Sequence, residues 1–427
     1  MRNSRLNSKC SQILNQFLLI SVLAYFNISI VFAQSVPINK PPDIKYRRSS
    51  LHTILIESDR FPFKDTVIRA YYNAPFPEKY NNHCIGEKSF DPKKYLILSD
   101  ESESYKAIID LYLSENKIAN KLVAKWFNRK DDGSFDMNLI GERGSYNASE
   151  MEANIAQKSA RGLSSLADAG EELIGNTFVV FSKLNFVSNE IAAAITRDAA
   201  KAAADQIPDV FVRIAAKKAA DIAYKKLKEG YSVWTKSYLY RLIWNDSVST
   251  VFYNDYWMDI NSIDSVRKLK FDNTSLFELE YIGDENSRSL VTFSLKEKRS
   301  DEKIVEIATI RNLDAIYSKL QKSYDVFKTK TPLYTGYPIT AKIGLKEGVE
   351  GGDKYEVLEQ VLDEQGKTKY VRKGIIKVDK NHIWDNRFNP CEEQSEDNAS
   401  TDMQIKDYTL FEGGDNYYAG MLIRQIK

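Results

Sequence analysis

The residues best suited to chemistry begin with an adjacent histidine and cysteine, His83 and Cys84. Neighbouring side chains of extended backbone point to opposite sides, and no second His/Cys pair has the spacing of metal ligands. His382 stands alone far along the chain. The sequence therefore does not favour a metal site at this pair.

Two acidic stretches could also support chemistry. Glu171 and Glu172 directly precede an apolar run at residues 173–181, where two carboxylates could form an acid/base pair. Neither a nucleophile motif nor a histidine lies near them, so acids of a helix-end loop are the favoured interpretation. Residues 131–136 resemble the start of a calcium loop but lack its alternating ligands and closing glutamate. We predict no catalytic, cofactor-binding or metal-binding residue.

Aromatic side chains are the other candidates for a site. Trp234, Tyr240 and Trp257 could form a surface for a protein partner or a glycan. Aromatic residues are also favoured on the packed faces of sheets, and this is the preferred interpretation of the row to which Tyr240 belongs.

These candidates flank a strand, a long helical segment and two further strands. Both faces of the strand at residues 173–181 are apolar, which predicts burial on both sides under packed helices. The helix is expected from about residue 188 to 229, is rich in alanine, and is kinked or split at Pro208. Its small residues should let it lie close to a neighbour, and its scattered acids argue against a membrane surface. Strands are expected at residues 234–244 and 248–257, joined around residues 245–247.

The rest of the amino-terminal part alternates strands and helices. We expect strands at residues 51–57, 66–72, 268–282 and 290–295, with a turn beginning at Gly283. We expect helices at residues 102–127, broken near 115–116, at 150–169 and at 303–328.

The carboxyl-terminal part, residues 329–427, predicts a small β-barrel. Residues 339–358 should pair two short strands about a glycine-rich turn, and further strands are expected at 369–372, 374–378 and 420–425. The glycines do not form a phosphate loop, because the closing Gly-Lys-Ser/Thr and a following helix are missing. Residues 389–402, rich in acids, serine and asparagine, are expected to form a disordered insertion.

The first 33 residues have the pattern of a secretory signal peptide. Arg2, Arg5 and Lys9 precede an apolar stretch, and small residues end at Ala33. A retained membrane anchor is the alternative, although the apolar run is short for one. Residues 34–50 have the composition of a linker. In an oxidising compartment Cys84 and Cys391 could form a disulfide, and two separate thiols are the equal alternative.

Charge argues against nucleic acid as a partner. Loss of the leader removes three of the 60 basic residues and none of the 59 acidic ones, leaving 57 against 59. Nucleic-acid binding depends on concentrated positive charge. We find no second apolar run long enough to cross a bilayer.

Three stretches resemble a family of exported Bacteroidetes proteins, over most of the exported chain. They are residues 171–180, residues 238–246 and the glycine-rich segment 344–357. The last part also resembles the SH3-like barrel of envelope assembly proteins such as the flagellar T-ring protein. The order of strands and helices is similar to the α/β domains of curli-secretion and related periplasmic proteins. The resemblance brings no catalytic residues.

The expected architecture is therefore α+β: an α/β sheet-and-helix body at residues 51–328 with the alanine-rich helix, followed by an SH3-like barrel. We expect a non-catalytic periplasmic or outer-membrane-associated scaffold that binds other envelope proteins or itself. The alternative is a secreted glycan-binding protein or hydrolase, which could use Glu171 and Glu172.

Overall fold

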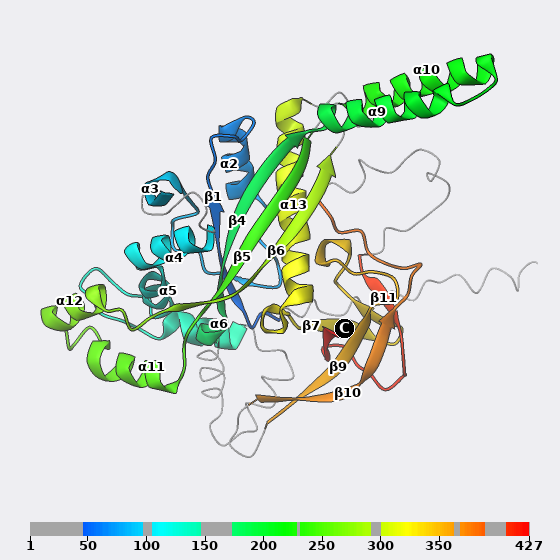
Figure 1. Ribbon diagram of the computed structural model, residues 1–427. Helices are drawn as coiled ribbons and strands as arrows, with labels where there is room; N and C mark the ends of the chain where they lie inside the picture. Colours follow the sequence, from blue (N-terminus) through cyan, green and yellow to red (C-terminus); the bar gives the residue numbers. More distant parts are fainter. Residues whose placement is uncertain are drawn as a thin grey trace, which may run out of the picture. The chain divides into compact units, whose positions relative to one another are not determined.

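The computed structural model describes residues 46–96, 105–146, 173–228, 231–291, 300–362, 368–388 and 407–426. Within them a mixed sheet with helices is followed along the chain by a closed β-barrel, so the predicted α+β class is confirmed (Figure 1).

The sheet of the body changes from parallel to antiparallel pairing at its middle. Its strands lie in the order β2 (Asn81–Asn82), β1 (Ser50–Ile56), β4 (Thr177–Ser188), β5 (Tyr231–Leu242) and β6 (Leu279–Val291), and β3 (Ser89–Phe90) also pairs with β1. β1 runs parallel to β2, β3 and β4, whereas β5 is antiparallel to both β4 and β6.

Helices cover both faces of this sheet. One buried cluster joins Val179, Phe181 and Tyr240 to α4 (Tyr105–Glu115) and α5 (Ile118–Trp126). The opposite cluster joins Phe178, Val180 and Leu239 to α2 (Lys64–Asn73) and α13 (Asp301–Ser323). The expectation that the apolar central strand is buried on both sides is confirmed for β4, because its alternate side chains enter different cores.

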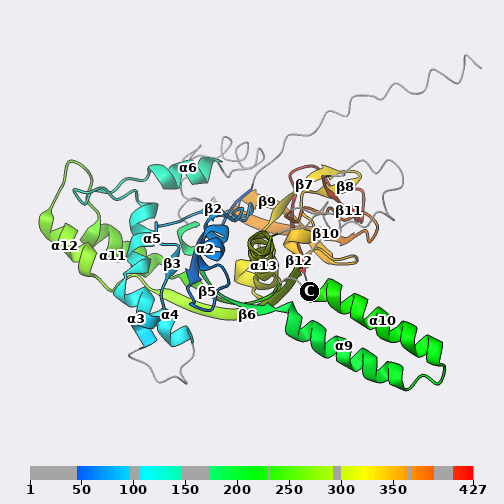
Figure 2. The same cartoon turned by 90° about the horizontal axis from the view of Figure 1, so that it is seen from above.

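The alanine-rich segment forms a helical hairpin inserted between two neighbouring strands. α9 (Asn189–Asp205) follows β4 directly, and α10 (Val210–Leu227) leads into β5. The split at Pro208 is confirmed, since the chain reverses there and Asp209 caps α10 by accepting a hydrogen bond from the amide of Val212. The close neighbour of each helix is the other half of the hairpin, and the two lie side by side in Figure 2.

Two expected strands are helices instead. Residues 66–72 lie in α2, where the buried Val67, Ala70 and Tyr71 follow helical spacing. A helix fits here, because β1 pairs with the later, parallel strand β2 and the connection between two parallel strands usually contains a helix. Residues 248–257 form α11 (Asp246–Val251) and the π-helix η1 (Phe252–Tyr256), which begin at the cap Asn245. Aromatic and β-branched composition misleads in both places.

Three further boundaries differ from expectation. Residues 173–175 form a helical turn, so the central strand begins at Thr177. The expected strand 268–282 is divided between α12 (Ser265–Asn273) and β6. Gly283 lies inside β6 beside an irregularity in the pairing with β5, not in a turn. The remaining helices described in the body are α3 (Lys93–Leu96), α6 (Asn138–Tyr146) and the 3-10 turn η2 (Asp325–Phe327).

The helix predicted at residues 102–127 is confirmed for the described residues from 105 onward, which form α4 and α5. The predicted break lies between Glu115 and Ile118. The helix predicted at 303–328 is confirmed as α13 and η2. The helix predicted at 150–169 and the insertion predicted at 389–402 lie outside the described residues.

The carboxyl-terminal region closes into a six-stranded antiparallel barrel, compatible with a small SH3-like barrel. Its order is β10 (Thr368–Val378), β11 (Thr409–Glu412), β8 (Ile339–Ala341), β7 (Thr331–Gly336), β12 (Leu422–Ile426) and β9 (Lys354–Leu362). β8 and β9 do not pair with each other, contrary to expectation, because η3 (Leu345–Glu347) separates them and each finds other partners. Residues 369–372 and 374–378 belong to one strand with an irregularity beside Gly374. β7 and β11 were not predicted from the sequence.

The barrel is tied to the body. Tyr46, in the expected linker, is buried against Leu358 and Leu422 of the barrel. Lys79 donates to the carbonyl of Lys342 at 3.0 Å, which joins the segment before β2 to the end of β8. Residues 46–50 are therefore packed structure.

Candidate functional site

A pocket of about 390 Å³ lies between α4, α5 and the edge formed by β5 and β6. This volume is within the range of small-molecule sites. Aromatic rings supply one part of its lining and charged groups another. Its principal side chains are Lys106, Asp110, Lys117, Asn120, Tyr240, Phe277, Glu278 and Tyr281.

Three polar side chains of this pocket, those of Tyr240, Asp110 and Lys106, pair with one another. The hydroxyl of Tyr240 donates to Asp110 Oδ1 at 2.8 Å, and Lys106 Nζ lies 2.5 Å from the other oxygen of Asp110. Burial first, and the Asp110 carboxylate second, raise the pKa of Tyr240 well above its usual value. Tyr240 therefore remains a neutral donor, and Asp110 is held as an acceptor by two partners. The arrangement suits binding of a polar ligand between aromatic and charged walls.

The three aromatic candidates from the sequence do not come together. Tyr240 is buried and lines the pocket, whereas Trp234 and Trp257 do not line it. Trp234 lies on the same face of β5, is 47% exposed, and has the guanidinium carbon of Arg288 at 4.8 Å from its ring. Trp257 follows η1 and stacks on Phe135 inside an aromatic cluster, with 5.8 Å between the two ring centroids.

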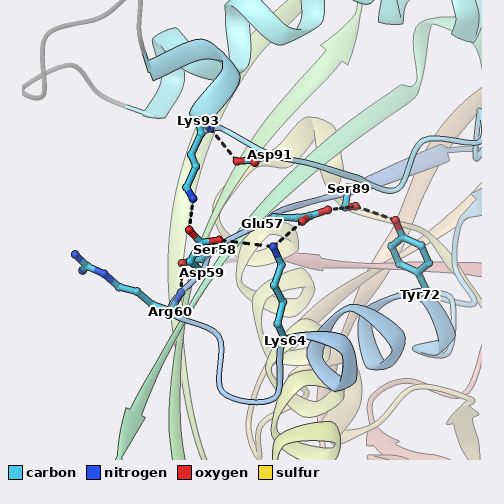
Figure 3. A network of polar contacts seen from close by, with 9 residues as sticks. All are labelled: Glu57, Ser58, Asp59, Arg60, Lys64, Tyr72, Ser89, Asp91 and Lys93. Carbon is cyan, nitrogen blue, oxygen red and sulfur yellow. Dashed lines mark hydrogen bonds and ion pairs between the residues drawn. The ribbon is translucent and has the colours of Figure 1, made fainter.

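The carboxyl end of β1, a common position for ligand sites in parallel sheets, carries a network of paired charges. Lys64 Nζ lies 3.2 Å from Glu57 Oε2 and also contacts Asp59, which forms an ion pair with Lys93 (Figure 3). Ser89 donates to Glu57 Oε1 at 2.8 Å. The network fastens the loop after β1 to β3 and α3, and its carboxylates are occupied by these partners.

His83 belongs to a buried stack. Its ring lies 4.8 Å from that of Trp126, and Arg143 lies 4.5 Å above the same tryptophan. Nε2 of His83 is 3.0 Å from the carbonyl oxygen of Leu122, and Nδ1 is 2.9 Å from Arg143. Burial, then the charge of Arg143, holds the pKa of His83 well below its ordinary value. His83 is therefore neutral, packs on Trp126 and holds Arg143 in position through its Nδ1.

Cys84, next in the chain, is half-buried. Its proposed partner Cys391, and the pair Glu171 and Glu172, lie outside the described residues, so the disulfide and the acid pair remain predictions. Among the residues that the structure describes, no group of three or more histidine, cysteine, aspartate or glutamate side chains could hold a metal ion.

The hairpin of α9 and α10 has an unusual distribution of polar and apolar groups. Ion pairs hold the two helices together: Lys201 to Asp221 and Lys217 to Asp205, each at 2.5 Å. Tyr224 donates to Glu190 across the same interface at 3.3 Å. The large apolar side chains are instead exposed. They are Ile191, Ile195, Val210, Phe211, Val212, Ile214 and Ile222.

Helical spacing places four of these apolar residues on two opposite faces of the hairpin. On α9, Ile191 and Ile195 are one turn apart and lie away from the inward Lys201; both are about two-thirds exposed, at 65% and 66%. On α10, Phe211 and Ile222 share the face away from Asp221, and they are 85% and 49% exposed. We refer to these two surfaces as the α9 face and the α10 face.

Local sequence patterns predicted the helical segment but not this arrangement. The sequence does show which residues share a helix face: Ile191 and Ile195 lie four residues apart, and so do Lys217 and Asp221. Only the reversal at Pro208 shows which of these sets faces the other helix.

Comparison with known proteins adds no relative. No protein-family model matches the chain, and a search of curated proteins returns no similar sequence. Within the part of the chain that the structure describes, no helix is long and apolar enough to cross a bilayer.

Proposed function

We propose that the protein is an exported, non-catalytic assembly or scaffolding factor of the cell envelope, and that the hairpin of α9 and α10 is its protein-binding element. The observation that carries this proposal is the exposure of large apolar side chains along both helices of the hairpin. Exposed apolar surface of this kind marks sites where proteins bind. Tyr224 and the ion pairs between α9 and α10 hold the two faces in position.

Three features favour an envelope setting. The first is the leader-like sequence at residues 1–33. The second is the closed barrel, compatible with the SH3-like module of envelope assembly proteins. The third is the resemblance of residues 171–180, 238–246 and 344–357 to exported Bacteroidetes proteins.

The register of the sheet allows a sharp experiment. Ser188 and Tyr231 are directly opposite each other in β4 and β5. Residues 189–230 can therefore be replaced by Asn-Gly, the preferred two-residue hairpin turn, with the sheet kept intact. We call this protein the turn variant. Chemical cross-linking in the native envelope should recover a partner of fixed stoichiometry with the unaltered protein and lose it with the turn variant.

Circular dichroism and thermal unfolding of the turn variant provide the control for folding. Recovery of the same partner at the same yield from both proteins would show that the hairpin is not the binding element. Recovery of the unaltered protein without any partner, itself included, would refute the scaffold function.

A second function is favoured by the pocket at Tyr240: binding of a glycan between Tyr240, Phe277 and Tyr281. Aromatic faces beside carboxylates and an amide are suited to sugar rings and their hydroxyls. Binding of glycan fragments, measured by calorimetry, should then weaken at least tenfold in Asp110→Asn or Phe277→Ala. Turnover that disappears in Glu171→Gln and Glu172→Gln would indicate a hydrolase, whereas unchanged behaviour in those two variants would exclude these acids.

A further inference from the structure

The two exposed faces of the hairpin match each other. The α9 face carries Ile191, Ile195 and Asp198, and the α10 face carries Phe211, Lys218 and Ile222. Consider α9 of one copy placed antiparallel to α10 of another, with Ile195 opposite Ile222. One turn forward along α9 is Asp198, and one turn back along α10 is Lys218, so these two residues also lie opposite each other. An apolar pair and an ion pair therefore coincide in a single alignment.

Alanine completes the match. One more turn along this alignment places Ala202 beside Ala215, and both are exposed. Small side chains at that level let two helices approach closely without a clash. Asp198 is 64% exposed and uses Oδ1 to pair with its sequence neighbour Arg197, so its carboxylate can also reach a cation on another chain.

We infer that the occupant of these faces is a second copy of this chain, with the α9 face of one hairpin packed on the α10 face of the next. This inference rests on the proposed function and names the partner of that same element. Because different faces meet, the contact is heterologous, and repetition of it produces a ring or a filament.

A lipid surface fits the same residues less well. A helix lying on a membrane buries one face, with its polar groups on the other. Here Ile195 and Ile222 lie on opposite sides of the hairpin, and the side of α9 carries Asp198. Stacked copies cover both sides at once.

Each contact is small. α9 has 17 residues and is about 25 Å long, so one helix face is at the lower limit of stable interfaces. Each copy makes two such contacts, however, and closure of a ring joins them cooperatively. Cross-linking is therefore a more suitable first test than gel filtration.

The test uses paired cysteines in a chain whose natural cysteines are replaced by serine. Ile195→Cys protein and Ile222→Cys protein are purified separately and oxidised alone or mixed. The inferred geometry predicts disulfide-linked dimers in the mixture, at least tenfold more than in either protein alone. Ladders of higher oligomers are expected from the double variant. No excess in the mixture, or equal self-linking of Ile195→Cys, would overturn the inference.

Charge reversal provides a second, independent test. In the same cysteine background, Asp198→Lys should reduce cross-linking at least fivefold, and so should Lys218→Asp. The two reversals combined in one chain should restore it, because opposite charges again meet. All four positions are exposed, so folding is expected to be retained and is checked by circular dichroism. Loss without restoration would contradict the alignment.

These outcomes separate the inference from the proposed function. One outcome is that no cross-linking occurs, and that the unaltered protein recovers a different envelope protein which the turn variant does not recover. This outcome would overturn the inference that the partner is a second copy, and the scaffold function would stand. Absence of cross-linking and hairpin-dependent binding to anionic phosphatidylglycerol vesicles would assign the hairpin to lipid and overturn both.

Discussion

At the scale of single residues, the clearest consequence concerns the buried histidine of β1. His52 is fully buried, and neither ring nitrogen has a hydrogen-bond partner within the described part of the chain. Burial, followed by the positive charge of Lys125, lowers the pKa of His52 to about 3. The folded protein therefore holds His52 neutral over a range in which the unfolded chain is protonated.

The sign of the pH effect follows from this difference. The stabilisation is complete above pH 6.5, the ordinary value for histidine, and is lost as the pH falls from 6.5 toward 3. The loss is about 1.4 kcal/mol per pH unit. In His52→Leu we expect a flatter decline of the unfolding free energy between pH 6.5 and 5, measured by urea denaturation. Parallel curves for the two proteins in that range would contradict this account, and curves above about pH 7 serve as the control.

Asp314 predicts the opposite dependence. It lies on α13 beside the barrel, 3.8 Å from Lys346, and burial, only partly offset by Lys346, raises its pKa to about 6. The folded state therefore takes up this proton more readily than the unfolded chain. The resulting stabilisation is complete below about pH 4 and is lost as the pH rises to about 6.

The substitution Asp314→Asn removes the buried carboxylate charge, which destabilises the folded state at neutral pH. We expect the variant to be more stable than the unaltered protein at about pH 7.5, by at most about 3 kcal/mol, with no difference near about pH 4. Urea denaturation at the two pH values measures it. A variant that is less stable at the higher pH would show instead that the Lys346 contact dominates.

At the scale of elements, β6 shows why a glycine was misinterpreted. Gly283 suggested a turn, but the strand continues through it with a φ of 156°, and Tyr324 packs directly over this position. A Cβ atom here would overlap the hydroxyl oxygen of Tyr324. The requirement for glycine comes partly from this backbone conformation and partly from Tyr324, a residue far along the chain that local sequence does not contain.

Gly283→Ala should therefore destabilise the protein by roughly 1–3 kcal/mol, the usual cost of overpacking. Thermal unfolding measures the loss. A second substitution, Tyr324→Leu, removes the obstructing hydroxyl, so the effect of Gly283→Ala should be smaller in that background. An equal effect in both backgrounds would indicate backbone strain rather than the contact with Tyr324.

Whether each of the other elements could be predicted depends on whether local or long-range interactions determine it. The helices at α4, α5 and α13 were predictable because their spacing and breaks are local, as at Glu115. The strand expected at 248–257 was wrong, since Phe252 and its neighbours contact a distant aromatic cluster rather than a neighbouring strand. In the candidate pocket, Tyr240 was identified from sequence, but its partner Asp110 is 130 residues away.

At the scale of the whole molecule, the hairpin distinguishes this protein from a closed α/β domain. Ion pairs of Lys201 and Lys217 hold the two helices together, and the isoleucine and phenylalanine side chains on the outside are exposed. Burial of such surface is the main favourable term in protein association. In the proposed function, the body and barrel are the support from which the two faces are presented.

Sedimentation velocity over a concentration series, with the unaltered protein beside the turn variant, tests this account most directly. We predict that the average sedimentation coefficient of the unaltered protein rises with concentration, while that of the turn variant stays at the monomer value. The same sedimentation coefficient for both proteins at every concentration would contradict the claim that the hairpin joins copies of this chain.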